Sequence, residues 1–164
     1  RLAEPMRAAP ASRRDGDAAD APVLVQVRAL FKEFTIGSGR VAVLRGVDLT
    51  LRQREMATII GASGAGKSTF LHCLGTLDLP TSGSIMFEGT DITRLSPAEL
   101  AAFRNRSIGF VFQFHHLLPE FSALENAMMP ALIARRPTRE AREAAESMLE
   151  AVGMSHRLKH RPGE

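Results

Sequence analysis

The stretch GASGAGKS, residues 61–68, decides which class of fold this sequence can adopt. It matches the pattern G-x-x-x-x-G-K-[ST] of phosphate-binding loops at every defined position. Glycines let such a loop curl until several backbone N–H groups point inward, with no side chain in the way of a phosphate. MATII before the loop predicts a strand, and STFLHCLGTL after it predicts a helix whose positive end favours an anion. A flexible glycine turn would need neither a strand before it nor a helix after it. Because both are predicted here, the sequence favours a nucleotide-binding loop.

The side chains at the end of the loop have the chemistry that a bound nucleotide requires. Lys67 places a positive charge between the β- and γ-phosphates, and the Ser68 hydroxyl is a ligand for Mg²⁺. Thr69 is placed to hydrogen-bond the α-phosphate. The residues predicted to bind the nucleotide here are Gly61, Ala62, Ser63, Gly64, Ala65, Gly66, Lys67, Ser68 and Thr69.

Alternating or continuous apolar residues predict strands on both sides of the loop. We expect them in VLVQVRALFKEF (23–34), VAVLRGVDLTL (41–51), TSGSIMFEGTDI (81–92) and SIGFVFQ (107–113), with a glycine turn at TIGSGR (35–40). Strands come first, then strand, loop and helix, then mostly helix. This order predicts an α/β domain with a helical extension that starts near Phe114.

Three helices are predicted in the second half of the chain. Two of them begin with a capping box, Ser96 with Glu99 and Ser122 with Glu125. The third, in PTREAREAAESMLEAVG (137–153), is amphipathic and is predicted to end at Gly153. Its expected apolar face is formed by Ala141, Ala145, Met148, Leu149 and Val152.

Composition bounds the remaining possibilities. The chain has 164 residues, 45% of them hydrophobic, which is enough for one ordinary domain. A net charge of +3 suits an anionic ligand or a membrane surface, and it is too small to argue for nucleic acid, which we do not expect as a partner. Cys73 is the single cysteine, so no internal disulfide forms, and we expect it to be a small core residue. Residues 1–22, rich in Ala, Pro, Arg and Asp, are predicted to be a disordered leader or linker.

Beyond the loop, the sequence from about Val23 to Glu164 resembles the ATP-binding subunits of ABC transporters. Three features carry the resemblance: Phe34 upstream of VLRGVDLTL, the loop GASGAGKST, and Gln113 at the end of IGFVFQ. The resemblance implies a P-loop NTPase fold, an ABC ATPase nucleotide-binding domain over residues 23–164 with an N-terminal antiparallel β subdomain. It also implies that residues from about 114 to 164 form the Q-loop and the start of a helical subdomain.

The resemblance assigns roles to single residues. Phe34 stacks on the adenine of ATP, and Gln113 reaches the Mg²⁺ and the γ-phosphate side. Lys67 and Gln113 are then the catalytic candidates, and Ser68 and Gln113 the Mg²⁺ candidates. Phe34 as a core aromatic at a strand end is the alternative.

The stretch FQFHHLLPEFSALEN, residues 112–126, has three possible interpretations. Adjacent histidines on an extended segment point to opposite sides, so His115 and His116 are unsuited to sharing one metal. The segment is either core or, as the resemblance implies, a surface that receives a coupling helix of the membrane subunit.

Within the family, FHHLLPEFSALENAMMPALI and HRPGE resemble the group that serves lipoprotein release. That implies an ATPase at the cytoplasmic face of the bacterial inner membrane, peripheral, with membrane-spanning subunits and a second ATP-binding subunit as partners. A macrolide-type exporter or a regulatory ATP-binder of a cell-division complex is the alternative. An unrelated GTPase is disfavoured because the sequence has no N-K-x-D motif.

The resemblance also implies motifs that we cannot identify in these 164 residues. They are the signature motif expected after Glu164, the Walker B aspartate, the catalytic glutamate and the switch histidine. The sequence is therefore expected to be the nucleotide-binding part of a longer ATPase.

Overall fold

The computed structural model describes residues 7–10, 21–114 and 116–164. It divides into two compact units, Arg1–Leu100 and Ala101–Glu164, and each is described here by itself. Among the described residues, no helix is both long enough and apolar enough to cross a membrane.

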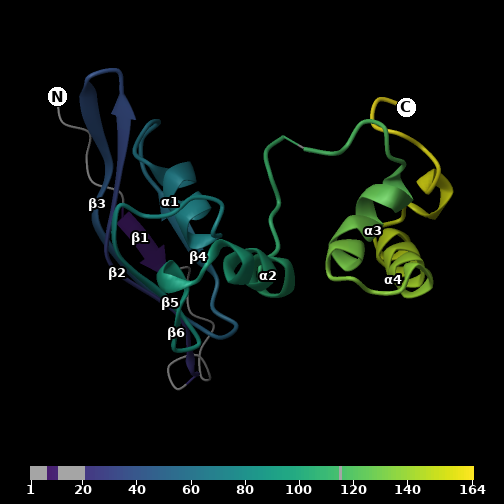
Figure 1. Cartoon of the computed structure of the whole chain (residues 1–164), viewed down its shortest axis with the longest axis horizontal. Helices are drawn as coiled ribbons and strands as arrows, with labels where there is room; N and C mark the ends of the chain where they lie inside the picture. The colour runs from purple at the N-terminus through teal and green to yellow at the C-terminus, as the bar shows by residue number, and fades with distance from the viewer. Residues whose placement is uncertain (1–6, 11–20, 115) are drawn as a thin grey trace. The chain divides into compact units, whose positions relative to one another are not determined.

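The first unit is built on a four-stranded antiparallel sheet with the order β3-β2-β5-β6. The strands are β2 (Val23–Ile36), β3 (Gly39–Arg52), β5 (Ser82–Phe87) and β6 (Thr90–Asp91). β2 and β3 form the long hairpin seen in Figure 1, with Gly37 at φ +60° in its turn. The strands predicted from residues 23–34, 41–51 and 81–92 are confirmed.

A close approach between β5 and β2 fixes the middle of this sheet. The register of β2 shifts next to Ala29, whose N–H donates to Asp48 Oδ1 at 2.8 Å. Gly83 in β5 has φ +95°, and a Cβ there would lie 2.3 Å from the backbone oxygen of Ala29. Only glycine fits at this crossing, because any side chain would push the two strands apart.

A short strand and a helix carry the glycine loop between them. β4 (Ala57–Ile60) leads into the loop, and α1 (Lys67–Leu74) follows it. α1 buries Phe70 and Cys73, which confirms Cys73 as a small core residue. The core of the unit also contains Val25, Val27, Leu30, Leu44, Ile85 and Ile92.

The partner of β4 comes from the segment predicted to be disordered. β1 (Arg7–Pro10) pairs antiparallel with β4, in the register Arg7 with Ile60 and Pro10 with Ala57. Four residues of the expected leader are therefore a strand, because the backbone groups of β4 require hydrogen-bond partners. Residues 1–6 and 11–20 lie outside the described residues.

The short 3₁₀ turn η1 (Ile92–Arg94) leads to α2 (Pro97–Ser107), which spans the division between the units. The predicted capping box is present: Ser96 N–H and hydroxyl donate to Glu99 Oε2, and Glu99 N–H donates back at 3.4 Å.

The second unit has a core of its own, made by α3 (Ala123–Ile133) and α4 (Thr138–Ala151), which lie side by side in Figure 1. Leu124 and Met128 from α3 pack on Ala141 and Ala145 from α4. The 3₁₀ turn η2 (Ser155–Arg157) follows α4, and Leu158 closes the cluster. Gly153, at φ +74°, lies just after the end of α4, and the N–H groups of Gly153 and Met154 bond back to Glu150 and Leu149.

One structural prediction for this half of the chain is wrong, and the amphipathic helix predicted over 137–153 is present but buries only part of its apolar face. SIGFVFQ forms no strand: residues 108–113 have no ladder partner within the described part of the chain, and Val111 is fully exposed. On α4, Ala141, Ala145 and Leu149 pack on α3, but Met148 and Val152 are exposed. The buried stripe is narrower than the apolar stripe because α3 and Leu158 cover only one side of it.

The crossing at Gly83 gives a stability prediction. Gly83→Ala should lower the free energy of unfolding by at least about 2 kcal/mol more than Gly89→Ala, because it adds overpacking to backbone strain. Gly89 is the matched control, since it has a similar φ of +82° but open space around its Cα. Urea unfolding of both variants measures the difference, and equal losses would contradict the close approach.

Candidate nucleotide-binding site

The backbone of the glycine loop has a shape that favours glycine. Gly64 and Gly66 have φ values of +78° and +89°. A Cβ on Gly66 would lie 3.0 Å from Val43 Cγ1 and 3.1 Å from the Val43 oxygen. The loop therefore rests directly on β3, and its last glycine is required both by backbone angle and by space.

The start of α1 provides donors for an anion. Gly66 is the N-cap and offers no side-chain hydrogen bond, and the first turn contains no acidic residue. The first N–H groups of a helix have no partner within the helix, and its dipole places partial positive charge there. The preceding loop, residues 61–66, contains only Gly, Ala and Ser, so none of its own side chains is large.

Lys67 and the two residues after it extend this donor set. The Lys67 ammonium donates to the backbone oxygens of Gly61 and Ala62, at 2.9 Å and 2.7 Å, so it folds back over the loop. Ser68 is exposed and Thr69 is half-buried. The nine predicted residues 61–69 are thus brought together on one loop and helix start, and their roles toward a nucleotide remain predictions.

Phe34 lies near the end of β2, in the same unit as the loop, with 38% of its side chain exposed. This exposure argues against Phe34 as an ordinary core aromatic. The Lys32 ammonium lies 4.9 Å from the centre of the Phe34 ring. Lys32 also donates to Asp78 Oδ1 at 2.6 Å and to the Leu79 oxygen at 2.7 Å, which joins β2 to the turn after α1.

Lys32 is a residue that the sequence reasoning missed. The signal was present, because residues i and i+2 of a strand share a face, so Lys32 and Phe34 had to be neighbours. Cys73 faces the same charges: burial, and then the Asp78 carboxylate, raise the pKa of its thiol, while Lys32 opposes the shift. A neutral, buried thiol is a packing group and not a nucleophile.

Gln113 belongs to the second unit, in the segment between α2 and α3, and its side chain is exposed. Its predicted role at the Mg²⁺ and the γ-phosphate is not tested by the geometry of either unit. His115 lies outside the described residues. His116 has φ +48°, and its ring meets Phe112 edge-on at 4.9 Å. Among the described residues, no three His, Cys, Asp or Glu side chains gather where they could hold a metal ion.

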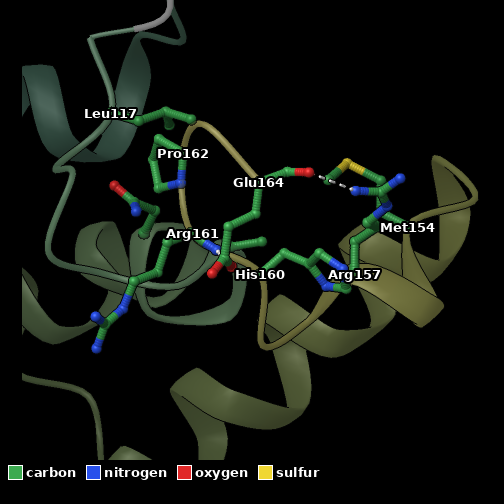
Figure 2. Close-up of a pocket in the computed structure, with 9 residues that line it drawn as sticks. Leu117, Met154, Arg157, His160, Arg161, Pro162 and Glu164 are labelled. Atoms are coloured by element: carbon green, nitrogen blue, oxygen red, sulfur yellow. Dashed lines mark hydrogen bonds between the residues drawn. The ribbon is translucent and has the colours of Figure 1, made fainter.

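The segment after Gln113 is not core. Phe114 is 71% exposed, and Leu117, Leu118 and Phe121 are exposed as well. Leu117 lines a pocket of about 170 Å³ that lies within the second unit, opposite the chain from Met154 to Glu164 (Figure 2). The other residues of this pocket are Ala123, Asn126, Met154, Arg157, His160, Arg161, Pro162 and Glu164.

Comparison with known proteins agrees with this geometry. Residues 44–164 match the family model described as ABC transporter. The chain is 57% identical over 141 residues to the lipoprotein-releasing system ATP-binding protein LolD of Geobacter metallireducens, which covers 86% of this chain and 63% of that protein. It is 52% identical over 141 residues to LolD of Myxococcus xanthus, with the same coverage.

A solved structure extends the comparison to three dimensions. The dimeric ATP-binding cassette MJ0796, in a post-hydrolysis state bound to ADP and Pi, superposes with a TM-score of 0.72 at 30% identity, over 85% of this chain and 62% of that one. The chain spans less than two thirds of the length of these relatives. The fold is that of a P-loop NTPase nucleotide-binding domain, with an antiparallel β sheet and helices, as the resemblance implied. The protein belongs to the ABC transporter family, as an ATP-binding protein similar to LolD.

Proposed function

We propose that the protein is the ATP-binding subunit of an ABC transporter, in which ATP binding and hydrolysis drive the release of lipoproteins from the inner membrane. The observation that carries the ATP-binding step is the loop at the start of α1, where Gly66 and Lys67 shape an uncapped helix N-terminus for phosphate. The lipoprotein-releasing role is supported by the 57% identity to LolD. The subunit would sit peripherally at the cytoplasmic face of the inner membrane.

The residues present fit Mg²⁺ and ATP. The orphan N–H groups of α1 and the open loop would hold the β-phosphate, and the Lys67 ammonium would exchange two carbonyl oxygens for phosphate oxygens. The Ser68 hydroxyl would ligate Mg²⁺, with Gln113 as a second candidate from the other unit. Mg²⁺ supplies charge neutralisation between the β- and γ-phosphates.

Phe34 would bind the other end of the nucleotide. Its ring is exposed enough for one face to stack on adenine, and Lys32 occupies a position over the ring. Lys32 is itself tied to Asp78, so the ring is held next to a fixed charge. The adenine site and the phosphate site would then be joined through β2, the Lys32 contacts and α1.

The exposed apolar residues of this segment, Phe114, Leu117, Leu118 and Phe121, would be the surface for the membrane-spanning subunits. Exposed apolar groups that gather on one segment usually mark an interface. As a cassette of this family, the protein would work with a second ATP-binding subunit, and MJ0796 was solved as a dimer.

The first prediction concerns Lys67. Lys67→Ala removes a charge-assisted contact worth about 1.5–3 kcal/mol, so ATP·Mg affinity should fall about tenfold or more. Calorimetric titration of the full-length protein measures this. Lys159→Ala, an exposed lysine of the second unit, is the control and should bind ATP normally. Equal affinities for Lys67→Ala and the parent protein would end the phosphate-loop assignment.

The second prediction concerns the base. Phe34→Ala should weaken ATP about fivefold or more, because stacking on an aromatic ring contributes about 1–3 kcal/mol. Phe34→Trp should restore most of the affinity. Phe31→Ala is the matched control on the same strand, since Phe31 is equally exposed but its ring packs over Gly46. If Phe31→Ala and Phe34→Ala lose ATP affinity equally, stacking is not the cause.

The third prediction concerns the membrane partner. Changing Leu117 and Leu118 together to Ser should leave ATP affinity unchanged, because neither belongs to the phosphate loop. It should weaken assembly with the membrane subunits about tenfold, since two half-exposed leucines lose their apolar contacts. Pull-down against increasing concentrations of the membrane subunits measures this, with circular dichroism to show folding. Normal assembly and transport by the folded variant would remove the interface.

A further inference from the structure

We infer that Asn126 is a positioning residue, whose carboxamide holds residues 118–122 in one shape and ties the partner-facing leucines to the start of α3. The inference rests on the proposed role of this surface in contacting the membrane subunits. Asn126 would act on that surface through the backbone groups of Leu118, Phe121 and Ser122.

The carboxamide of Asn126 makes four hydrogen bonds to this loop. Its Oδ1 accepts the Leu118 N–H at 2.9 Å, and its Nδ2 donates to the Leu118 oxygen at 3.1 Å. The same Nδ2 also lies 3.0 Å from the oxygens of Phe121 and Ser122, so its two hydrogens are shared among three acceptors. Both backbone groups of Leu118 are therefore bound by one side chain, in the way a neighbouring strand would bind them.

The loop needs such an anchor because it has little regular structure of its own. Within it, the Phe121 N–H donates to the Leu118 oxygen at 3.1 Å, a turn with Pro119 in its second position. The side chains of Leu118 and Phe121 are exposed, so side-chain burial does not fix the turn. The Asn126 hydrogen bonds link both ends of this turn, Leu118 and Phe121, to α3.

The first turn of α3 is in turn bound to the chain that follows α4. The Ala123 N–H donates to the His160 oxygen at 2.8 Å, and the Leu124 N–H donates to the Leu158 oxygen at 3.1 Å. Ser122 caps α3, and its backbone N–H and hydroxyl, which donate to the Glu125 carboxylate, hold the pKa of that carboxyl below its ordinary value. The start of α3 is thus hydrogen-bonded both to the loop before it and to residues 158–160.

The pocket in Figure 2 lies at this junction, because Leu117 and Asn126 line it together with Arg157 and His160. A displacement of Leu118 would reach residues 158–160 through two sets of hydrogen bonds, those of the Asn126 side chain and those of the Ala123 and Leu124 N–H groups. Asn126 would therefore make the loop and this segment respond to the partner as one body.

The experiment compares Asn126→Ala with a matched control in the full-length protein. Asn126→Ala should raise the hydrogen exchange rate of the Leu118 amide about tenfold or more, because that N–H loses its acceptor. The concentration of membrane subunits needed for half-maximal assembly should also rise about tenfold, with ATP affinity changed less than twofold. Asn105→Ala removes a carboxamide that makes one hydrogen bond, to the Pro130 oxygen at 3.1 Å, and should change neither.

Asn126→Asp tests whether weaker assembly comes from the lost hydrogen bonds or from the smaller volume of the Ala side chain. The carboxylate keeps an acceptor for the Leu118 N–H, but it would face the oxygens of Leu118, Phe121 and Ser122 without a proton to donate. Assembly of Asn126→Asp should therefore be at least as weak as that of Asn126→Ala. Normal assembly by either folded Asn126 variant, or an unchanged Leu118 exchange rate in Asn126→Ala, overturns the inference.

If the Asn126 variants fail to fold, hydrogen exchange of the parent protein tests the inference instead. Docking of the membrane subunits should slow hydrogen exchange at Leu118 and at Ala123 and Leu124 together, and slowing at Leu118 alone overturns the inference. The variant with Leu117 and Leu118 both changed to Ser distinguishes a failure of the proposed partner-facing surface from a failure of the Asn126 inference. If it assembles normally, the partner-facing surface fails and the inference with it; if it assembles weakly while Asn126→Ala assembles normally, the inference alone fails.

Discussion

The contact between Gly66 and β3 is the constraint on which the site depends. The left-handed backbone of Gly66 brings the end of the loop within van der Waals distance of Val43 and Leu44, where no Cβ has room. Leu44 is itself part of the core that Phe70 of α1 shares, so the first turn of α1 is fixed at one end by the loop and at the other by packing. A helix N-terminus attracts phosphate through its direction as well as its charge. The two-point attachment gives α1 that direction before any ligand arrives.

The same sheet fixes the position of the aromatic ring. Lys32 joins β2 to the turn after α1 by an ion pair and a carbonyl contact, and its ammonium also lies near Phe34. The Lys32 side chain is largely buried while that of Asp78 is more exposed, so the pair is screened less than a fully exposed one and stays open to solvent on one side. Loop, helix and ring are therefore parts of one packed unit, and a change in the turn after α1 would be felt at Phe34 through Lys32.

The sequence was most informative where local chemistry determines structure. The loop, both capping boxes, the β2–β3 hairpin and the burial of Cys73 follow from glycine angles, caps and alternation, which act over a few residues. It failed where structure depends on distant partners. SIGFVFQ has the composition of a strand but pairs with no other strand among the described residues. Arg7–Pro10 has the composition of a linker but pairs with β4. Asn126 was missed because its four acceptors and donors are set by the course of the loop before it, and a capping box alone does not show that course.

The second unit has a hydrophobic core of its own. The core of the second unit is made within residues 124–158, by Leu124 and Met128 on Ala141 and Ala145, without any residue of the phosphate loop. The packing of this unit is therefore set by its own residues, and the chain from α2 to α3 leads into it. That chain contains Gln113, followed at once by the exposed residues that we assign to the membrane partner. Residues 108–113 have no strand ladder within the described part of the chain, and Val111 among them is fully exposed, so burial of their apolar side chains does not fix this segment. Burial of apolar side chains is the main favourable free energy that can order such a segment, so the role we propose for Gln113 depends on the packing of its neighbours as well as on its own carboxamide.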